Sequence, residues 1–154
     1  MINIAHIHPM LVHFPLALLP VALGVQLLAL VKGQGLFDHR SLSSMGLSLI
    51  LIAAIMAIAA SLFGDIALDK AISIGVPLSL MENHEELGTL SAVLLGILAT
   101  AEIWFYRKIN INRTLNIGFL IAGFVVLLFI LTTAWFGGQL VYEHGVNVTP
   151  VVFP

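Results

Sequence analysis

The stretch Ser41–Gly64, SLSSMGLSLILIAAIMAIAASLFG, contains no Asp, Glu, Lys, Arg or His. It exceeds the about 20 mostly apolar residues that a helix needs to cross the hydrocarbon core of a bilayer. Three further stretches are similar, at residues 9–31, 87–106 and 114–142. Lone strands leave backbone groups unpaired in lipid, so all four should be helices. The sequence therefore predicts an all-α integral membrane four-transmembrane-helix bundle, forming a single membrane domain over residues 1–154.

The composition of the chain agrees with this fold class. Of the 154 residues, 60% are hydrophobic and only 9% are charged, whereas a soluble domain carries roughly a quarter charged residues. These values exclude a soluble globular domain and a disordered chain. A net charge of −2 gives no indication of a nucleic-acid partner. The absence of cysteine excludes disulfides, iron–sulfur clusters, thiolate zinc sites, covalent c-type haem and cysteine nucleophiles.

The six basic residues predict the orientation of the spans. Five of them lie in the first and third connections and one lies in the second: Lys32, Arg40, Arg107, Lys108 and Arg113, against Lys70. By the positive-inside rule the first and third connections are cytoplasmic, and both termini are extracytoplasmic. The first stretch is expected to be retained, because it lacks the basic segment that opens a signal peptide.

Histidines gather at one end of the predicted bundle. His8 and His13 lie at the start of the first span, His84 precedes the third, and His144 follows the fourth. Alternating spans bring all four to the extracytoplasmic side. Ionisable groups at membrane spans are candidates for function, and imidazole is a common ligand of metals and of haem iron. We therefore take these four histidines as candidate cofactor-binding or metal-binding residues and assign no catalytic residue.

Residues near these histidines are expected to orient the imidazoles or to leave space beside them. Asp65 and Glu143 could orient a ligand imidazole through its second ring nitrogen. Gly137 and Gly138 leave room for a close-packed neighbour, either a helix or a flat cofactor. His8 and His13 are five residues apart, about 140° around a helix. They should therefore not both face one small ion unless the lead-in is non-helical.

Other polar and small residues receive structural interpretations. Glu102 is expected to pair with Arg107 or Lys108 near the cytoplasmic surface, and Gln26 to form a hydrogen bond between helices. His6 and His39 are expected to be ordinary surface histidines. Four small residues spaced along one face of the second span are expected to form a helix-packing seam: Ala53, Ala57, Ala60 and Gly64.

Four motifs resemble a bacterial membrane family known as domain of unknown function 2231. They are the opening His8-Pro9-Met10-Leu11-Val12-His13-Phe14-Pro15, the pair Gly64-Asp65, His84, and the closing Gly137-Gly138-Gln139-Leu140-Val141-Tyr142-Glu143-His144-Gly145-Val146. The resemblance implies a multi-pass protein of the bacterial inner (cytoplasmic) membrane. Similar proteins are sometimes fused to c-type cytochrome modules, which implies redox partners. Similar proteins often continue Gly-Val-Gly-Val, and Asn147 here replaces the second glycine.

The first functional hypothesis is a b-type haem protein that transfers electrons rather than a self-contained enzyme. His13 and His84 are the expected axial pair, and His8 with His144 could hold a second haem or contact propionates. No histidine lies in the middle or the cytoplasmic half of a span. Electron transfer would therefore be confined to the outer side, for example from quinol to a periplasmic cytochrome.

Two other hypotheses remain. Three histidines with Asp65 or Glu143 suit a zinc or copper ion. Alternatively, the chain is a non-catalytic assembly or scaffold subunit of a membrane complex. Because four helices make a thin bundle, a homodimer or larger complex is also expected.

Overall fold

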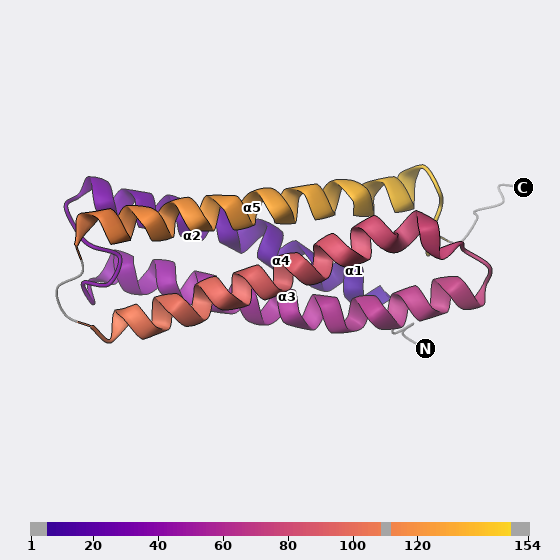
Figure 1. Ribbon diagram of the computed structural model, residues 1–154, viewed down its shortest axis with the longest axis horizontal. Helices are drawn as coiled ribbons and strands as arrows, with labels where there is room; N and C mark the ends of the chain where they lie inside the picture. Colours follow the sequence, from indigo (N-terminus) through magenta and orange to yellow (C-terminus); the bar gives the residue numbers. More distant parts are fainter. Residues whose placement is uncertain (1–5, 109–111, 149–154) are drawn as a thin grey trace, which may run out of the picture.

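The computed structural model describes residues 6–108 and 112–148, and within them all regular structure is helical. The helices are α1 (Ile7–Leu11), α2 (His13–Val31), α3 (Ser41–Ser73), α4 (Leu78–Tyr106) and α5 (Arg113–Tyr142). Figure 1 shows α2, α3, α4 and α5 running side by side along one axis. The predicted all-α, four-helix architecture is confirmed.

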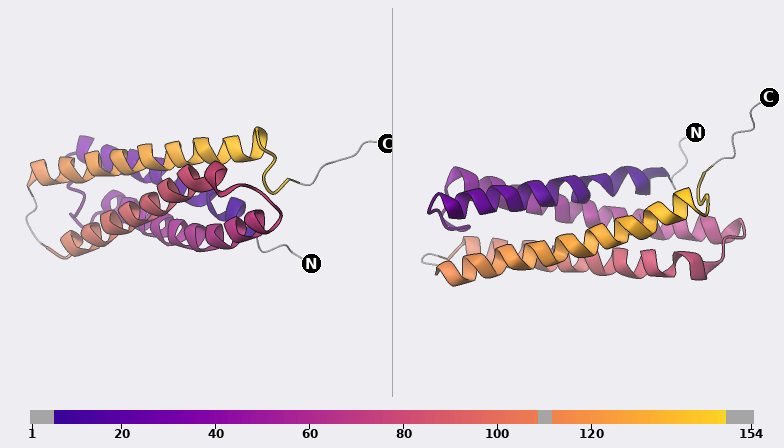
Figure 2. Two further views of the ribbon diagram at one scale, coloured as in Figure 1. Left: turned by 45° about the vertical axis from the view of Figure 1, so that its right-hand side comes forward. Right: turned by 90° about the horizontal axis from the view of Figure 1, so that it is seen from above.

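The four long helices form an up-and-down bundle. α2 packs against α3 and α5, and α4 packs against the same two helices, as the two views of Figure 2 also show. One end of the bundle, which we call the terminal end, holds α1, residues 74–77 and residues 143–148 (Figure 1). The opposite end, which we call the basic end, holds residues 32–40, the C-terminus of α4 and the N-terminus of α5. Short connections between antiparallel neighbours are typical of this topology.

The bundle is apolar inside and outside. Its core includes Leu19 and Leu23 from α2, Ile50 from α3 and Leu95 from α4, all with 0% exposure. Large apolar side chains also point outward on every long helix, and examples are Val21, Leu62, Ile97 and Leu128. Four helices are long and apolar enough to cross a membrane. A continuous apolar exterior is stable against lipid chains and would be unfavourable in water.

Two helices extend beyond the spans expected from hydropathy. α3 continues past Gly64 to Ser73, and α4 begins at Leu78 rather than at residue 87. The second connection therefore comprises only residues 74–77, where Gly75 has φ +94° and ends α3 with a left-handed residue. Hydropathy marks the part of a helix that suits hydrocarbon, whereas a helix can continue into the polar interface. The charged residues that follow Gly64 are therefore helical.

The first span starts with a short separate turn. α1 has Pro9 within its first turn, where the missing N–H costs no hydrogen bond, and it ends at Val12 before α2 begins. α1 has no buried residue and packs on α3 and α2. This placement brings His8 toward α3.

The segment after α5 folds back on the terminal end. Val146 is buried with Ala71, Met81 and Leu140 in a small apolar cluster. Asn147, where similar proteins have glycine, has φ +61°. Asn is among the few residues that adopt this left-handed conformation readily. The replacement therefore keeps the glycine-like backbone.

Candidate histidine site

His8 is fixed by a main-chain group of another helix. Its Nδ1 lies 2.8 Å from the carbonyl oxygen of Ala60 in α3. A carbonyl oxygen only accepts hydrogen bonds, so Nδ1 carries the proton and donates. In the neutral ring, Nε2 is then left with a lone pair. His8 is therefore oriented as a ligand imidazole usually is, with its second nitrogen available.

His84 has the same arrangement on the opposite side of the bundle. It lies in the second turn of α4, and its Nδ1 is 3.0 Å from the carbonyl oxygen of Thr133 in α5. The same reasoning places its proton on Nδ1 and a lone pair on Nε2. Two helix pairs thus each supply one imidazole and one carbonyl: α1 with α3, and α4 with α5.

The two imidazoles meet between these helix pairs. The ring centres of His8 and His84 are 5.9 Å apart, and the ring planes are inclined by 84°. Both side chains are half-buried. Two imidazoles on opposite sides of one metal would have ring centres about 6 Å apart, given a metal–nitrogen bond of about 2 Å on each side. The separation therefore suits two ligands of a single metal centre.

Two glycines give the rings their space. A Cβ atom at position 64 would lie 3.1 Å from Nδ1 of His8, and one at position 137 would lie 2.8 Å from Cε1 of His84. Both contacts are tighter than ordinary van der Waals distance. Gly137 was expected to accommodate a helix or a flat cofactor, and it accommodates the imidazole of His84. At the corresponding position of Gly138, no atom of the described residues lies within 4 Å apart from the nearby backbone of its own helix.

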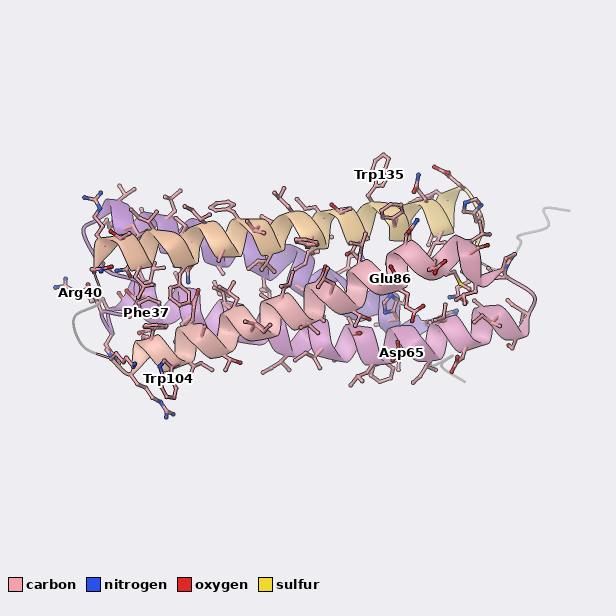
Figure 3. All side chains as sticks on the ribbon, viewed as in Figure 1. Phe37, Arg40, Asp65, Glu86, Trp104 and Trp135 are labelled. Carbon is pink, nitrogen blue, oxygen red and sulfur yellow. The ribbon has the colours of Figure 1, made fainter. Side chains whose placement is uncertain are left out.

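Four other predicted site residues are exposed, in contrast to this half-buried pair. His13, expected to pair with His84, is exposed, and its Nδ1 contacts the carbonyl oxygen of Pro9 one turn earlier. His144, Asp65 and Glu143 are also exposed. Figure 3 labels Asp65 and Glu86 toward the terminal end and Arg40 at the basic end. Among residues 6–108 and 112–148, no three His, Cys, Asp or Glu side chains form a group that could hold a metal ion.

A hydroxyl pair lies beside His84. Thr133 Oγ1 donates to the carbonyl oxygen of Phe129 at 2.9 Å, so Ser91 is the donor in its 3.1 Å hydrogen bond to Thr133 Oγ1. This hydrogen bond joins α4 to α5, and Ser91 lies about two helical turns after His84 along α4. The residue type of Thr133 could not indicate this role, because Thr133 holds His84 through its backbone carbonyl.

A second polar contact lies toward the basic end. Gln26 Nε2 donates to Glu102 Oε1 at 3.0 Å and to Oε2 at 2.9 Å, which confirms the hydrogen bond between helices expected of Gln26. The expected partner of Glu102 was wrong: Lys108 Nζ lies 5.1 Å from the ring centre of Trp104, and Arg107 is exposed. Glu102 faces the core of the bundle, where neither basic residue reaches.

Comparison with known proteins identifies the family. A family model described as "Predicted membrane protein (DUF2231)" matches residues 5–150. The chain belongs to this family. No curated protein and no solved structure matches it. The resemblance stated from the four motifs is thereby confirmed, and the family description states membrane location without an activity.

Proposed function

We propose that His8 and His84 are the axial ligands of a b-type haem at the terminal end, and that the protein is an electron-transfer component of a membrane chain. One observation carries this proposal. Both imidazoles donate through Nδ1 to carbonyls of neighbouring helices, leaving two Nε2 lone pairs on rings whose centres are 5.9 Å apart. When bound, the iron would carry one electron by cycling between its ferric and ferrous states.

The donor set fits a haem, because two neutral imidazoles on facing helices are a common axial pair. A groove of about 220 Å³ lies between α3 and α4, and its lining includes Ser61 and Thr89 but neither His8 nor His84. This volume is below the about 300–1,000 Å³ of typical small-molecule pockets. A porphyrin therefore needs the helices to separate.

The decisive experiment is an absorption spectrum of the purified protein, oxidised and dithionite-reduced, after haem-replete expression. We expect a Soret band in the wild-type protein and its loss or weakening in His8→Ala and His84→Ala. His13→Ala is the matched control, because His13 is exposed and contacts only its own turn among the described hydrogen bonds. A wild-type protein without a Soret band would end the haem proposal.

A bare zinc or copper ion is the second candidate. The 5.9 Å ring separation also suits two imidazoles on one small ion, which would then need further ligands from water or from an exposed residue such as Asp65. Elemental analysis separates the two candidates. Stoichiometric zinc or copper without porphyrin would favour the ion, and loss of the metal in His8→Ala would assign it to this pair.

We also propose that the basic end faces the cytoplasm of a bacterial cell, so that the histidine pair exchanges electrons with a quinol or a periplasmic cytochrome. Five of the six Lys and Arg residues support this orientation. The chain has no cysteine, so labelling of a single-cysteine variant comes from the introduced residue. A membrane-impermeant thiol reagent applied to intact spheroplasts should label Glu82→Cys and spare Arg40→Cys. The reverse pattern would place the pair on the cytoplasmic side.

A further inference from the structure

The most deeply buried ionisable group of the described chain lies outside the histidine site. Glu102 in α4 is 1% exposed, as is its partner Gln26 in α2. Gln26 supplies only its Nε2 group, which is shared between both carboxyl oxygens at 2.9 and 3.0 Å. An ionised carboxylate in such surroundings has lost its water and gained a single donor group. Buried carboxylates without compensation take up a proton instead.

No cation compensates Glu102 from the helices packed around it. α2 contributes Gln26 and has no ionisable residue after His13, and the ionisable residues of α3 lie at the terminal end. Tyr106, one turn further along α4, has its hydroxyl 2.6 Å from that of Ser44. Apart from the half-buried Tyr106, the described charged or titratable side chains of the basic end are exposed: Lys32, Asp38, His39, Arg40, Arg107, Lys108 and Arg113.

The amide of Gln26 carries the second, independent observation. Its Oε1 is buried and has no hydrogen-bond partner among the described residues. A buried carbonyl oxygen without a donor is unfavourable. An ionised Glu102 cannot relieve this, because a carboxylate only accepts, whereas a protonated Glu102 has an O–H group to donate. A rotation about the broad terminal torsions of the two side chains would bring that O–H to Oε1.

We propose that Glu102 is a proton-binding site within the membrane-spanning bundle, held as a neutral acid in a reciprocal pair with the Gln26 amide. One proton from water adds to a carboxylate oxygen. The amide N–H then donates to the acid carbonyl, and the acid O–H donates to the amide oxygen. Gly46 makes room for this pair, since a Cβ atom there would lie 2.9 Å from Cγ of Gln26. The proposal is independent of what the histidines bind.

Infrared spectroscopy of the full-length protein in lipid nanodiscs tests this proposal. Of the eight acidic residues, the other seven are exposed or half-buried: Asp38, Asp65, Asp69, Glu82, Glu85, Glu86 and Glu143. At pH 7 we expect one carbonyl band of a protonated carboxylic acid, abolished in Glu102→Gln. Glu85→Gln, at a half-buried acid on the same helix, is the control and should leave the band unchanged. Absence of the band at pH 7, or its persistence in Glu102→Gln, would overturn the proposal.

A second variant tests the pairing even if Glu102→Gln fails to fold. In Gln26→Leu the acid loses both hydrogen bonds, so its carbonyl band should remain and move to higher wavenumber. An unshifted band would show that the acid does not pair with Gln26. Loss of the band in this variant would also contradict the proposal, because removing the amide gives the carboxyl no new partner for its charge.

Discussion

The two ends of the bundle use buried polar groups differently. Toward the basic end, Gln26 and Glu102 contact each other, and the Leu36 N–H donates to Asn116 Oδ1 at 2.7 Å. These side chains are almost fully buried. At the terminal end, His8 and His84 are half-buried and each uses one nitrogen on a backbone carbonyl. Contacts of the first kind join buried groups from two parts of this chain, whereas two oriented imidazoles with Nε2 lone pairs suit the binding of a metal or cofactor.

The largest expected effect is a loss of cofactor affinity caused by a substitution beside His84. In Gly137→Ala the new Cβ would lie 2.8 Å from His84 Cε1, so the ring must shift from the position in which Thr133 holds it. We expect haem or metal affinity to fall about 10- to 100-fold, as for other losses of ligand orientation. Gly138→Ala is the control, because its Cβ would contact no described side chain and no other helix within 4 Å. Equal affinities in the two variants, measured by titration, would contradict the account.

The next effect concerns the basic end. Asn116→Ala removes the acceptor of the buried Leu36 N–H and should lower the free energy of unfolding by about 2 kcal/mol. Cofactor affinity should remain unchanged, because the contact lies at the other end of the bundle. Thr132→Ala in the same helix is the comparison, since Thr132 is exposed and bonds only the Leu128 carbonyl among the described contacts. Detergent unfolding followed by circular dichroism measures both variants.

The smallest effect distinguishes the backbone of Thr133 from its side chain. Thr133→Val keeps the carbonyl that accepts the hydrogen bond from His84 and removes the hydroxyl that accepts the hydrogen bond from Ser91. We expect a loss of about 1 kcal/mol or less in stability, as for other hydrogen bonds between membrane helices, and an unchanged cofactor spectrum. A changed spectrum would mean that the hydroxyl, rather than the carbonyl, positions the imidazole.

Much of the architecture follows from the sequence, because hydropathy and chain alternation determine which residues share an end of the bundle. They placed His8, His13 and His84 in one layer, yet they could not choose between His8 and His13. That choice depends on which side of the helix packs on α3: His8 contacts the Ala60 carbonyl, whereas His13, about 140° further around the helix, is exposed. Contacts made through backbone atoms, such as the Ala60 carbonyl, cannot be predicted from residue type, because every residue has a backbone carbonyl.

The role of small residues was also only partly predictable. Ala60 and Gly64 were interpreted as part of a helix-packing seam, and Ala60 is indeed buried. Gly64 instead faces the imidazole of His8. Spacing shows that small residues share one face of a helix, but it cannot show whether a helix or an aromatic side chain lies against that face.

The most direct test of the central claim is low-temperature electron paramagnetic resonance of the oxidised, haem-replete protein. Two axial imidazoles inclined by 84° should give a strongly anisotropic low-spin ferric signal, because perpendicular ring planes keep the iron orbitals nearly degenerate. We expect this signal in the wild type and in His13→Ala, and its loss in His8→Ala and His84→Ala. A low-spin signal that survives in His8→Ala and disappears in His13→Ala would contradict the assignment of His8 and His84 as the ligand pair.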